Sequence, residues 1–201
     1  MTSEKKLKRT IVKKEVAMDD LAFTSKSHVT LVTLGVCTCI AFTIQGSYWN
    51  DELDEKIDFC GLYHWSGFNV IPSDHDQQTQ SVFNYFLYTL RSTLKLNQTH
   101  PIEINSLQFI GGEKAQYDNN NKLLLTGTEA EVRSLTKTVQ EYDFKKNHFI
   151  LDPQNISHQH FLTSNDQSIQ ITLTTKQCDF IINEADVENN ESASPAKRIA
   201  L

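Results

Sequence analysis

The sequence is poor in cysteine, and its cysteines are not arranged for a disulfide framework or a zinc site. The 201 residues include four, at positions 37, 39, 60 and 178, and no two form a C-x-x-C pair. Such spacing is not typical of a small secreted scaffold or of structural zinc. His158 and His160 lack an evident third ligand, and a polar loop is expected there. We therefore expect free thiols, a reducing compartment and no bound metal.

The chain also lacks an excess of positive charge and a long hydrophobic run. It has 19 basic and 25 acidic residues and a net charge of −6, whereas nucleic-acid binders usually carry a basic footprint. The most apolar stretch, residues 29–44, is interrupted by threonines and cysteines, and no signal-peptide pattern precedes it. These absences predict a protein that neither binds nucleic acid nor inserts into a membrane. A cytoplasmic location is expected, with secretion as an effector as the alternative.

Composition divides the chain into three parts. Residues 1–15 contain six basic residues and predict a flexible basic arm. Residues 186–201 lack the apolar side chains that offset ordering entropy, which predicts a disordered tail. The intervening residues 16–185 have the composition and length expected of a single domain.

Hydrophobic periodicity predicts two helices and seven or eight strands. The first helix, residues 76–95, has apolar side chains at three- and four-residue spacing, and the second begins at a predicted capping box from Thr128 to Glu131. Strands are expected at 28–44 (interrupted at Gly35), 56–65, 102–110, 123–126, 149–151, 169–173 and 180–182, with a polar turn at 46–52. This order is typical of an α+β layered protein.

The segment from Val32 to Cys39 is the most informative for chemistry. Its sequence, Val-Thr-Leu-Gly-Val-Cys-Thr-Cys, places a thiol just beyond a glycine turn and at the start of a strand. A thiol in that position can meet a substrate while loop amides, from Gly35 through Thr38, stabilise the negative charge that develops during attack. A cysteine that only packs in a core is the alternative, and the commoner one.

A candidate base, His64, lies on the next predicted strand. If residues 37–44 and 57–65 pair as an antiparallel hairpin, Cys39 near the start of the first strand faces His64 near the end of the second. Thr33 can then orient the imidazole through a hydrogen bond. A core histidine packed beside its neighbour is the alternative.

These residues resemble a known family. Val32-Thr33-Leu34-Gly35-x-x-Thr38-Cys39-Ile40-Ala41 resembles the V-T-L-G-x-G-S-C-V-A signature of the chemoreceptor glutamine deamidases known as CheD, and Gly61-x-x-His64 resembles the G-x-x-H that follows it. The resemblance, over residues 16 to about 183, implies the CheD-like layered sandwich of mostly antiparallel sheet with two main helices. It also implies a catalytic set of Cys39, His64 and Thr33. Deamidating toxins related to cytotoxic necrotizing factor share this fold and triad.

The sequence departs from the family pattern in the loop that follows the motif cysteine. This loop is longer here and contains Tyr48, Trp49 and an acidic run, so a different substrate is expected. Together with Trp65, these aromatic residues are predicted to contact that substrate. The proline segment that follows the family histidine is present only as residues 71–72.

Cys37 is the alternative nucleophile, because it stands where the family has a second glycine and shares a strand face with Cys39. Its sixth residue upstream is Leu31, which has no hydroxyl, whereas the same spacing from Cys39 reaches Thr33. Cys39 is therefore the preferred nucleophile.

The predicted function is a cysteine-dependent protein-glutamine deamidase that hydrolyses a side-chain amide through a thioester and needs no cofactor. Its expected partner is a protein that carries a reactive glutamine. A transglutaminase or cysteine protease that uses the same pair is one alternative, and a non-catalytic protein-binding module on the same scaffold is another. A chemotaxis role, an effector role and the oligomeric state stay open at this stage.

Overall fold

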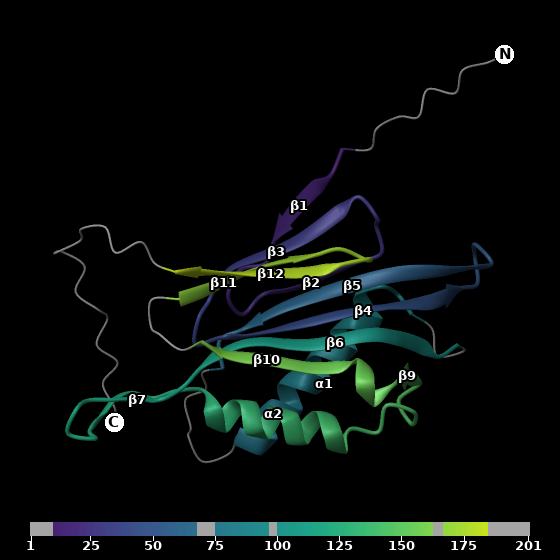
Figure 1. The fold of residues 1–201 in the computed structure, drawn as a ribbon. Helices are drawn as coiled ribbons and strands as arrows, with labels where there is room; N and C mark the ends of the chain where they lie inside the picture. Colours follow the sequence, from purple (N-terminus) through teal and green to yellow (C-terminus); the bar gives the residue numbers. More distant parts are fainter. Residues whose placement is uncertain (1–9, 68–74, 97–99, 163–166, 185–201) are drawn as a thin grey trace.

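The computed structural model describes residues 10–67, 75–96, 100–162 and 167–184, in which two β-sheets and a pair of helices form three layers (Figure 1). The helices are α1 (His75–Thr93) and α2 (Glu129–Glu141), and a short 3-10 turn, η1, spans Pro153–Asn155. The strands are β1 (Val12–Glu15), β2 (Leu21–Thr24), β3 (Val29–Val36), β4 (Ile40–Asn50), β5 (Glu55–Trp65), β6 (Ile102–Glu113), β7 (Gln116–Tyr117), β8 (Leu123–Leu125), β9 (Phe149–Leu151), β10 (Ile156–Leu162), β11 (Gln167–Leu173) and β12 (Cys178–Glu184). The predicted α+β class, a layered sandwich of mostly antiparallel sheets, is confirmed.

Strand pairing produces a smaller and a larger sheet. The smaller sheet has the order β1-β3-β11-β12, and the larger has the order β10-β6-β4-β5-β2 with β9 also paired to β6. In Figure 1 the smaller sheet lies above the larger one, and both helices cover the larger sheet from below. The larger sheet is therefore the central layer. β7 and β8 pair only with each other.

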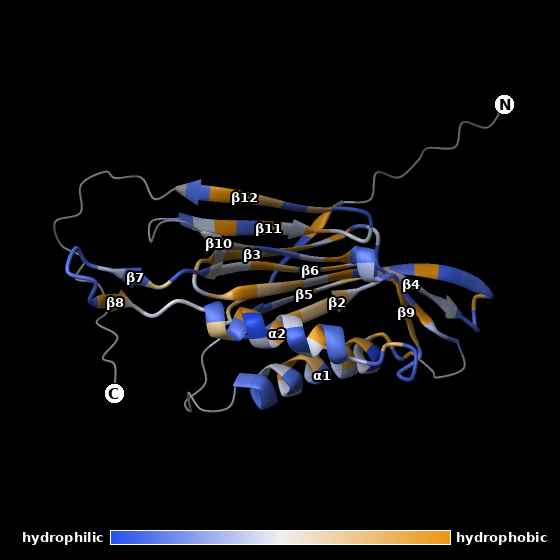
Figure 2. Ribbon diagram, turned by 60° about the horizontal axis from the view of Figure 1, so that its bottom comes forward, coloured by the Kyte–Doolittle hydropathy of each residue, from blue (hydrophilic) through white to orange (hydrophobic). Residues whose placement is uncertain are grey.

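Alternating side chains along β4 and β5 separate two hydrophobic cores. Phe42 belongs to the core between the larger sheet and the helices. Ala41 and Leu62 belong to a second core, which they form with Leu31 and Ile171 of the smaller sheet. Successive residues of a strand point to opposite faces, so each central strand contributes to both cores. Figure 2 shows hydrophobic residues along the central strands and polar residues interspersed along both helices. The helices are amphipathic, as their periodicity predicts.

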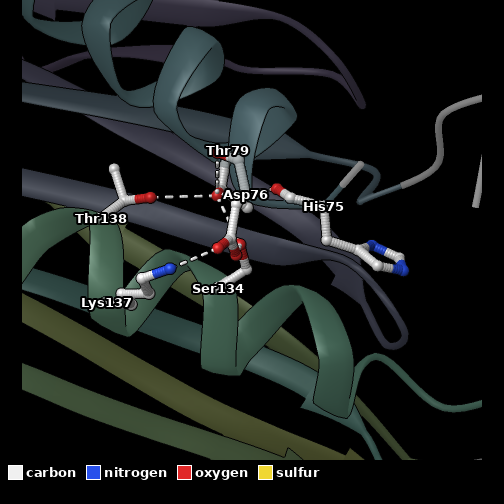
Figure 3. Close-up of polar contacts among 6 residues, drawn as sticks. All are labelled: His75, Asp76, Thr79, Ser134, Lys137 and Thr138. Carbon is white, nitrogen blue, oxygen red and sulfur yellow. Dashed lines mark hydrogen bonds and ion pairs between the residues drawn. The ribbon is translucent and has the colours of Figure 1, made fainter. Parts of the chain in front are cut away.

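The contact between α1 and α2 is made partly by hydroxyl groups (Figure 3). Thr79 Oγ1 lies 2.9 Å from Ser134 Oγ and 3.1 Å from Thr138 Oγ1. Asp76 accepts hydrogen bonds from Ser134 and Lys137, each at 2.5 Å, and these donors lower the pKa of its carboxyl group. Thr79 is buried. Its hydroxyl is satisfied by these neighbours, so the polar contact can persist at a buried interface.

The predicted capping box at the start of α2 is wrong. Thr128 makes no side-chain cap hydrogen bond, because its hydroxyl instead accepts the backbone N–H of Glu113 at 2.9 Å. Glu129 Oε1 similarly accepts the backbone N–H of Ala115 at 2.7 Å. Both side chains therefore fasten the helix start to the end of β6 rather than to the free amides of the helix.

Two sequence expectations, for residues 1–15 and for residues 46–52, are partly wrong. The predicted flexible arm is too long, because residues 12–15 form β1, which pairs in parallel with β3. The turn expected at 46–52 is mostly strand, since β4 continues to Asn50 before a turn at residues 51–54. β2 is an additional strand, paired antiparallel to β5, that the periodicity does not reveal.

The segment around His158 is a strand and not the expected polar loop. It forms β10, parallel to β6, and the His158 ring stacks on Phe109 with centroids 5.0 Å apart. Within the described ranges, no group of three histidine, cysteine, aspartate or glutamate side chains is placed to hold a metal ion. The predicted tail, 186–201, and the proline segment, 71–72, lie outside the described residues.

Candidate active site

The pairing of β4 with β5 determines which side chains meet at the Cys39 end of the hairpin. The two strands are antiparallel, as predicted, and Ala41 lies opposite His64. Both residues face the smaller sheet, because His64 follows Leu62 by two positions on β5. Cys39 immediately precedes β4 and packs in the same core as Ala41. The expectation that Cys39 itself faces His64 is wrong by two residues, because Ala41 takes that place. Continued by one residue beyond β4, the register would put Cys39 diagonally from His64, a position at which Cα atoms of paired strands lie roughly 7–8 Å apart.

A chain of two hydrogen bonds fixes the orientation of the His64 imidazole. Thr33 Oγ1, on β3 of the smaller sheet, lies 2.7 Å from His64 Nδ1 and donates to the carbonyl oxygen of Val16 at 2.7 Å. A hydroxyl has a single proton, and a carbonyl oxygen can only accept. Since the Thr33 proton goes to Val16, Nδ1 of His64 must supply the proton in the other bond. The Nε2 atom of neutral His64 is then left with a lone pair, which is the form of a general base.

Burial reinforces this neutral form. His64 is 3% exposed, and burial lowers the pKa of its imidazole, although the negative charge of Asp19 opposes that shift. Its Nε2 atom is buried and makes no hydrogen bond to another residue in the described parts of the chain. A buried polar atom without a partner is uncommon and often marks a functional position. The arrangement therefore holds an unoccupied acceptor between the two sheets.

The segment 16–20, between β1 and β2, is a part of this site that the motif analysis does not reveal. The backbone N–H of Asp19 donates to the His64 carbonyl at 2.6 Å, and the His64 N–H donates to Asp20 O at 3.1 Å. Asp19 Oδ1 also accepts the backbone N–H of Ser66 at 2.9 Å. These hydrogen bonds extend the backbone pairing of β2 with β5 as far as His64. Its only sequence signal is a pair of aspartates, which favours a turn and identifies no partner.

Cys39 is held by Gly111 and Gly112, two glycines near the end of β6. Its carbonyl oxygen accepts the backbone N–H of Gly112 at 2.7 Å, and a Cβ atom at Gly111 would lie 2.5 Å from the same oxygen. Gly111 also has a φ of +108°, which disfavours other residues. The Cys39 side chain is 6% exposed, and its Sγ atom lies 3.8 Å from Sδ of Met18. The glycines therefore allow the close approach that positions the thiol.

The loop between β3 and β4 contains the remaining motif residues. Gly35 has a φ of +69°, a left-handed conformation that glycine adopts without strain, and Thr38 is half-buried. Cys37 is also half-buried, and its pKa is raised by burial and by the negative charge of Glu113. A raised pKa reduces the thiolate fraction of Cys37 near neutral pH. The preference for Cys39 over Cys37 stays a prediction from the sequence.

Trp65 does not line this site, and its predicted contact with substrate is wrong. It is 3% exposed and belongs to the core beneath the helices, where its ring centroid lies 5.7 Å from that of Phe42. It directly follows His64 on β5, so the two side chains point to opposite faces of the sheet. Its role is to pack the helix layer.

Tyr48 and Trp49 lie at the other end of the β4–β5 hairpin. They pair with Ile57 and Lys56, eight positions or so along the strand from the site. At 3.2–3.4 Å per residue this separation is roughly 25 Å. Trp49 is half-exposed and near His100, with ring centroids 6.4 Å apart. These aromatic residues cannot contact a side chain bound at Cys39, and only a large partner would span both positions.

Two grooves in the described structure lie on the helix layer and not at Cys39. One, of about 450 Å³, is lined by Asn84, Leu87, Tyr88, Arg91, Tyr142, Lys146, Asn147, His148 and Phe149. The other, of about 460 Å³, is lined by Asp76, Gln77, Gln80, Asn84, Lys137, Thr138, Glu141, Tyr142 and Asp143. The larger sheet separates both grooves from the Cys39–His64 pair. Neither groove is lined by a cysteine.

Comparison with models of known protein families finds no match, and no curated protein is significantly similar in sequence. Among the residues that the structure describes, no helix combines the length and apolar character needed to cross a membrane.

Proposed function

We propose that the protein is a cysteine-dependent hydrolase of protein glutamine side chains, with Cys39 as nucleophile, His64 as general base and Thr33 as the residue that orients the base. The observation that carries this proposal is the directed hydrogen-bond chain from His64 through Thr33 to Val16. It leaves Nε2 as an acceptor in the same layer as the Cys39 thiol. The resemblance of the surrounding motif to CheD-type deamidases supports the assignment.

In the first half of the proposed reaction, the acyl group of the glutamine side chain is transferred from the amide nitrogen to the Cys39 sulfur. His64 Nε2 accepts the thiol proton as Cys39 Sγ attacks, and backbone amides of residues 35–39 stabilise the oxyanion. The C–N bond then breaks while the imidazolium returns the proton to the nitrogen. Ammonia leaves, and a thioester remains on Cys39.

Water completes the reaction. Nε2 takes a proton from a water molecule as its oxygen attacks the thioester carbon. The C–S bond breaks, the imidazolium returns the proton to Cys39, and a glutamate side chain is released. One water is consumed and one ammonia formed, so no oxidant, reductant or metal is required. Thr33 is uncharged, so it fixes the tautomer of His64 without stabilising the imidazolium strongly.

The burial of Cys39 favours a side-chain amide over a peptide bond as substrate. A thiol that is 6% exposed can be reached by an extended side chain of two methylenes and an amide. The main chain of a folded protein is much wider and would need the loop to open. The same restriction disfavours a second protein amine as acceptor, so water is the expected nucleophile for the thioester. Proteolysis and transamidation are therefore the less favoured chemistries for this pair.

The test is ammonia release from a peptide with one internal glutamine and from unfolded casein. Wild type and Cys37→Ala should release ammonia at similar rates, and Cys39→Ala should release none. Mass spectrometry should show NH2 replaced by OH on glutamine, whereas a chain break would indicate a protease and an amine adduct a transglutaminase. Loss of activity in Cys37→Ala would move the nucleophile to Cys37.

A second measurement separates an enzyme from a binding module without a substrate. Chloroacetamide, a small electrophile with a carboxamide group, should label Cys39 faster than Cys178 near neutral pH. Burial raises the pKa of the Cys178 thiol, which keeps it protonated. His64→Ala should abolish the difference. Equal labelling of both cysteines in the wild type would favour a non-catalytic scaffold.

A further inference from the structure

The residues 16–20, which we call the strap, are joined to all the elements that carry the proposed catalytic residues. The strap begins at Val16, whose N–H donates to Val32 O at 2.8 Å and whose carbonyl accepts the Thr33 hydroxyl. It ends at Asp20, whose carbonyl accepts the His64 N–H. The strap is therefore fixed at both ends across the two sheets. The residues between these ends have little freedom to move away as a unit.

Met18 is the strap residue whose side chain meets the nucleophile. Its Sδ atom lies 3.8 Å from Cys39 Sγ, while the methionine side chain itself is 60% exposed. Cys39, in contrast, is 6% exposed. The methionine thus lies between the buried thiol and solvent.

The flexibility of methionine makes this cover removable. The side chain is unbranched, with three rotatable bonds and a polarisable sulfur, and it adapts to varied apolar partners. Because Met18 is mostly exposed, a change of rotamer costs little packing. The strap backbone can stay bonded to Thr33 and His64 while the side chain alone moves. The thiol can therefore be uncovered without disturbing the base.

We propose that Met18 is a specificity-determining residue, which covers the Cys39 thiol in the free protein and packs against the methylenes of the glutamine side chain in the complex. This inference rests on the proposed function for its substrate. In this role, Met18 favours a substrate with an extended, unbranched side chain that can pass beside the thioether. Asparagine has one methylene fewer. With its backbone on the solvent side of Met18, its side chain would be too short to bring the amide to the thiol.

The experiment compares alkylation of Cys39 by iodoacetamide in the full chain, followed by mass spectrometry. Met18→Ala removes the thioether that contacts the thiol and should be labelled about fivefold faster than wild type, close to the factor that one methylene-sized contact is worth. Leu53→Ala is the matched control, because Leu53 is also 60% exposed but lies in the turn between β4 and β5. It should be labelled at the wild-type rate. Equal rates for all three proteins would overturn the proposal.

A second variant guards against unfolding as the cause of faster labelling. Met18→Phe retains an apolar cover that is larger and less flexible, so labelling of Cys39 should become slower. Unfolding can only make labelling faster, and a Met18→Phe rate at or above that of wild type would overturn the proposal. These rates depend on access to the thiol and not on turnover. They therefore test Met18 even if wild type releases no ammonia, which would count against the proposed function alone.

Turnover provides a further readout where activity is present. With the glutamine peptide, Met18→Ala should raise KM while kcat changes little, because the base and thiol are untouched. Activity on the corresponding asparagine peptide, relative to glutamine, should increase. A fall in kcat with unchanged KM would instead indicate that Met18 positions the thiol, and would contradict a specificity role.

Discussion

Replacing Thr33 with valine would remove the hydroxyl that links His64 to Val16 while keeping the shape of the side chain. Two buried polar groups would then lose their partner: the Nδ1 atom of His64 and the carbonyl oxygen of Val16. Each unsatisfied buried group costs about 1–3 kcal/mol, so we expect Thr33→Val to lower the free energy of unfolding by roughly 2–6 kcal/mol. Thr33 is fully buried, and water cannot readily replace the lost contacts.

The same substitution should reduce turnover by more than the loss of stability alone would cause. Without an acceptor at Nδ1, the proton can move to Nε2, and that tautomer cannot accept the thiol proton. Imposing the wrong histidine tautomer in a charged triad costs about 10⁴-fold in rate. Thr33 is uncharged, so a loss of 10- to 100-fold is expected here, well below that limit. Thr33→Ser keeps the hydroxyl and should retain most of the activity.

Urea unfolding and single-turnover thioester formation measure the two effects separately. Both should be made at a temperature where Thr33→Val stays folded, as judged by circular dichroism. A folded Thr33→Val protein with the wild-type rate of thioester formation would refute the tautomer argument. Wild-type stability in the same variant would show that the two hydrogen bonds are not formed in solution.

Two other predictions concern pH and backbone geometry. Burial lowers the His64 pKa below its ordinary value of 6.5. The stability that depends on neutral His64 is therefore complete above pH 6.5 and is lost as the pH falls toward the pKa of the folded state. His64→Gln should flatten this part of a stability–pH curve measured by urea unfolding. Gly111→Ala should destabilise the protein by about 2 kcal/mol or more and impair labelling of Cys39, because its Cβ would clash with the Cys39 carbonyl. Gly35→Ala, where no atom lies within 4 Å, should cost only about 1–2 kcal/mol, and equal losses in urea unfolding for both glycine variants would contradict the clash.

The central features of the fold could be predicted from sequence because their signals are strong and local. The apolar stripe of α1 and the long runs of β4 and β5 have clear periodicity. The antiparallel pairing of those two strands follows once they are recognised, but the register does not, because the turn lies at residues 51–54 and places Ala41 opposite His64. The position of Thr33 on the same segment as Cys39, together with the resemblance to CheD, predicts a hydroxyl near the imidazole, and the structure places that hydroxyl 2.7 Å from Nδ1.

Other elements were missed because tertiary contacts, not local patterns, stabilise them. β2 has four residues and lies in a chain with few apolar neighbours, and it is stable because it pairs with β5. β10 has the polar sequence Ser-His-Gln-His, yet its backbone pairs with β6. Thr128 has the residue type of a cap, but a nearby strand end competes for its hydroxyl. In each case the partner lies far along the chain.

Substrate-contact residues were predicted least well. Trp65 is an aromatic residue that the sequence places beside His64, but adjacent strand residues face opposite layers, and Trp65 packs in the core between the larger sheet and the helices. A methionine in a polar turn has no sequence signature, so the strap is not evident from the sequence. Its position becomes evident only from the 3.8 Å separation of the two sulfur atoms.

The division of the Thr33–His64 pair between two layers ties chemistry to tertiary assembly. Thr33 belongs to the smaller sheet and His64 to the larger, so their hydrogen bond exists only while the sheets are docked. A partly opened molecule could retain every strand and still lose the aligned base. Heat inactivation would then report the separation of the layers, ahead of the melting of either sheet.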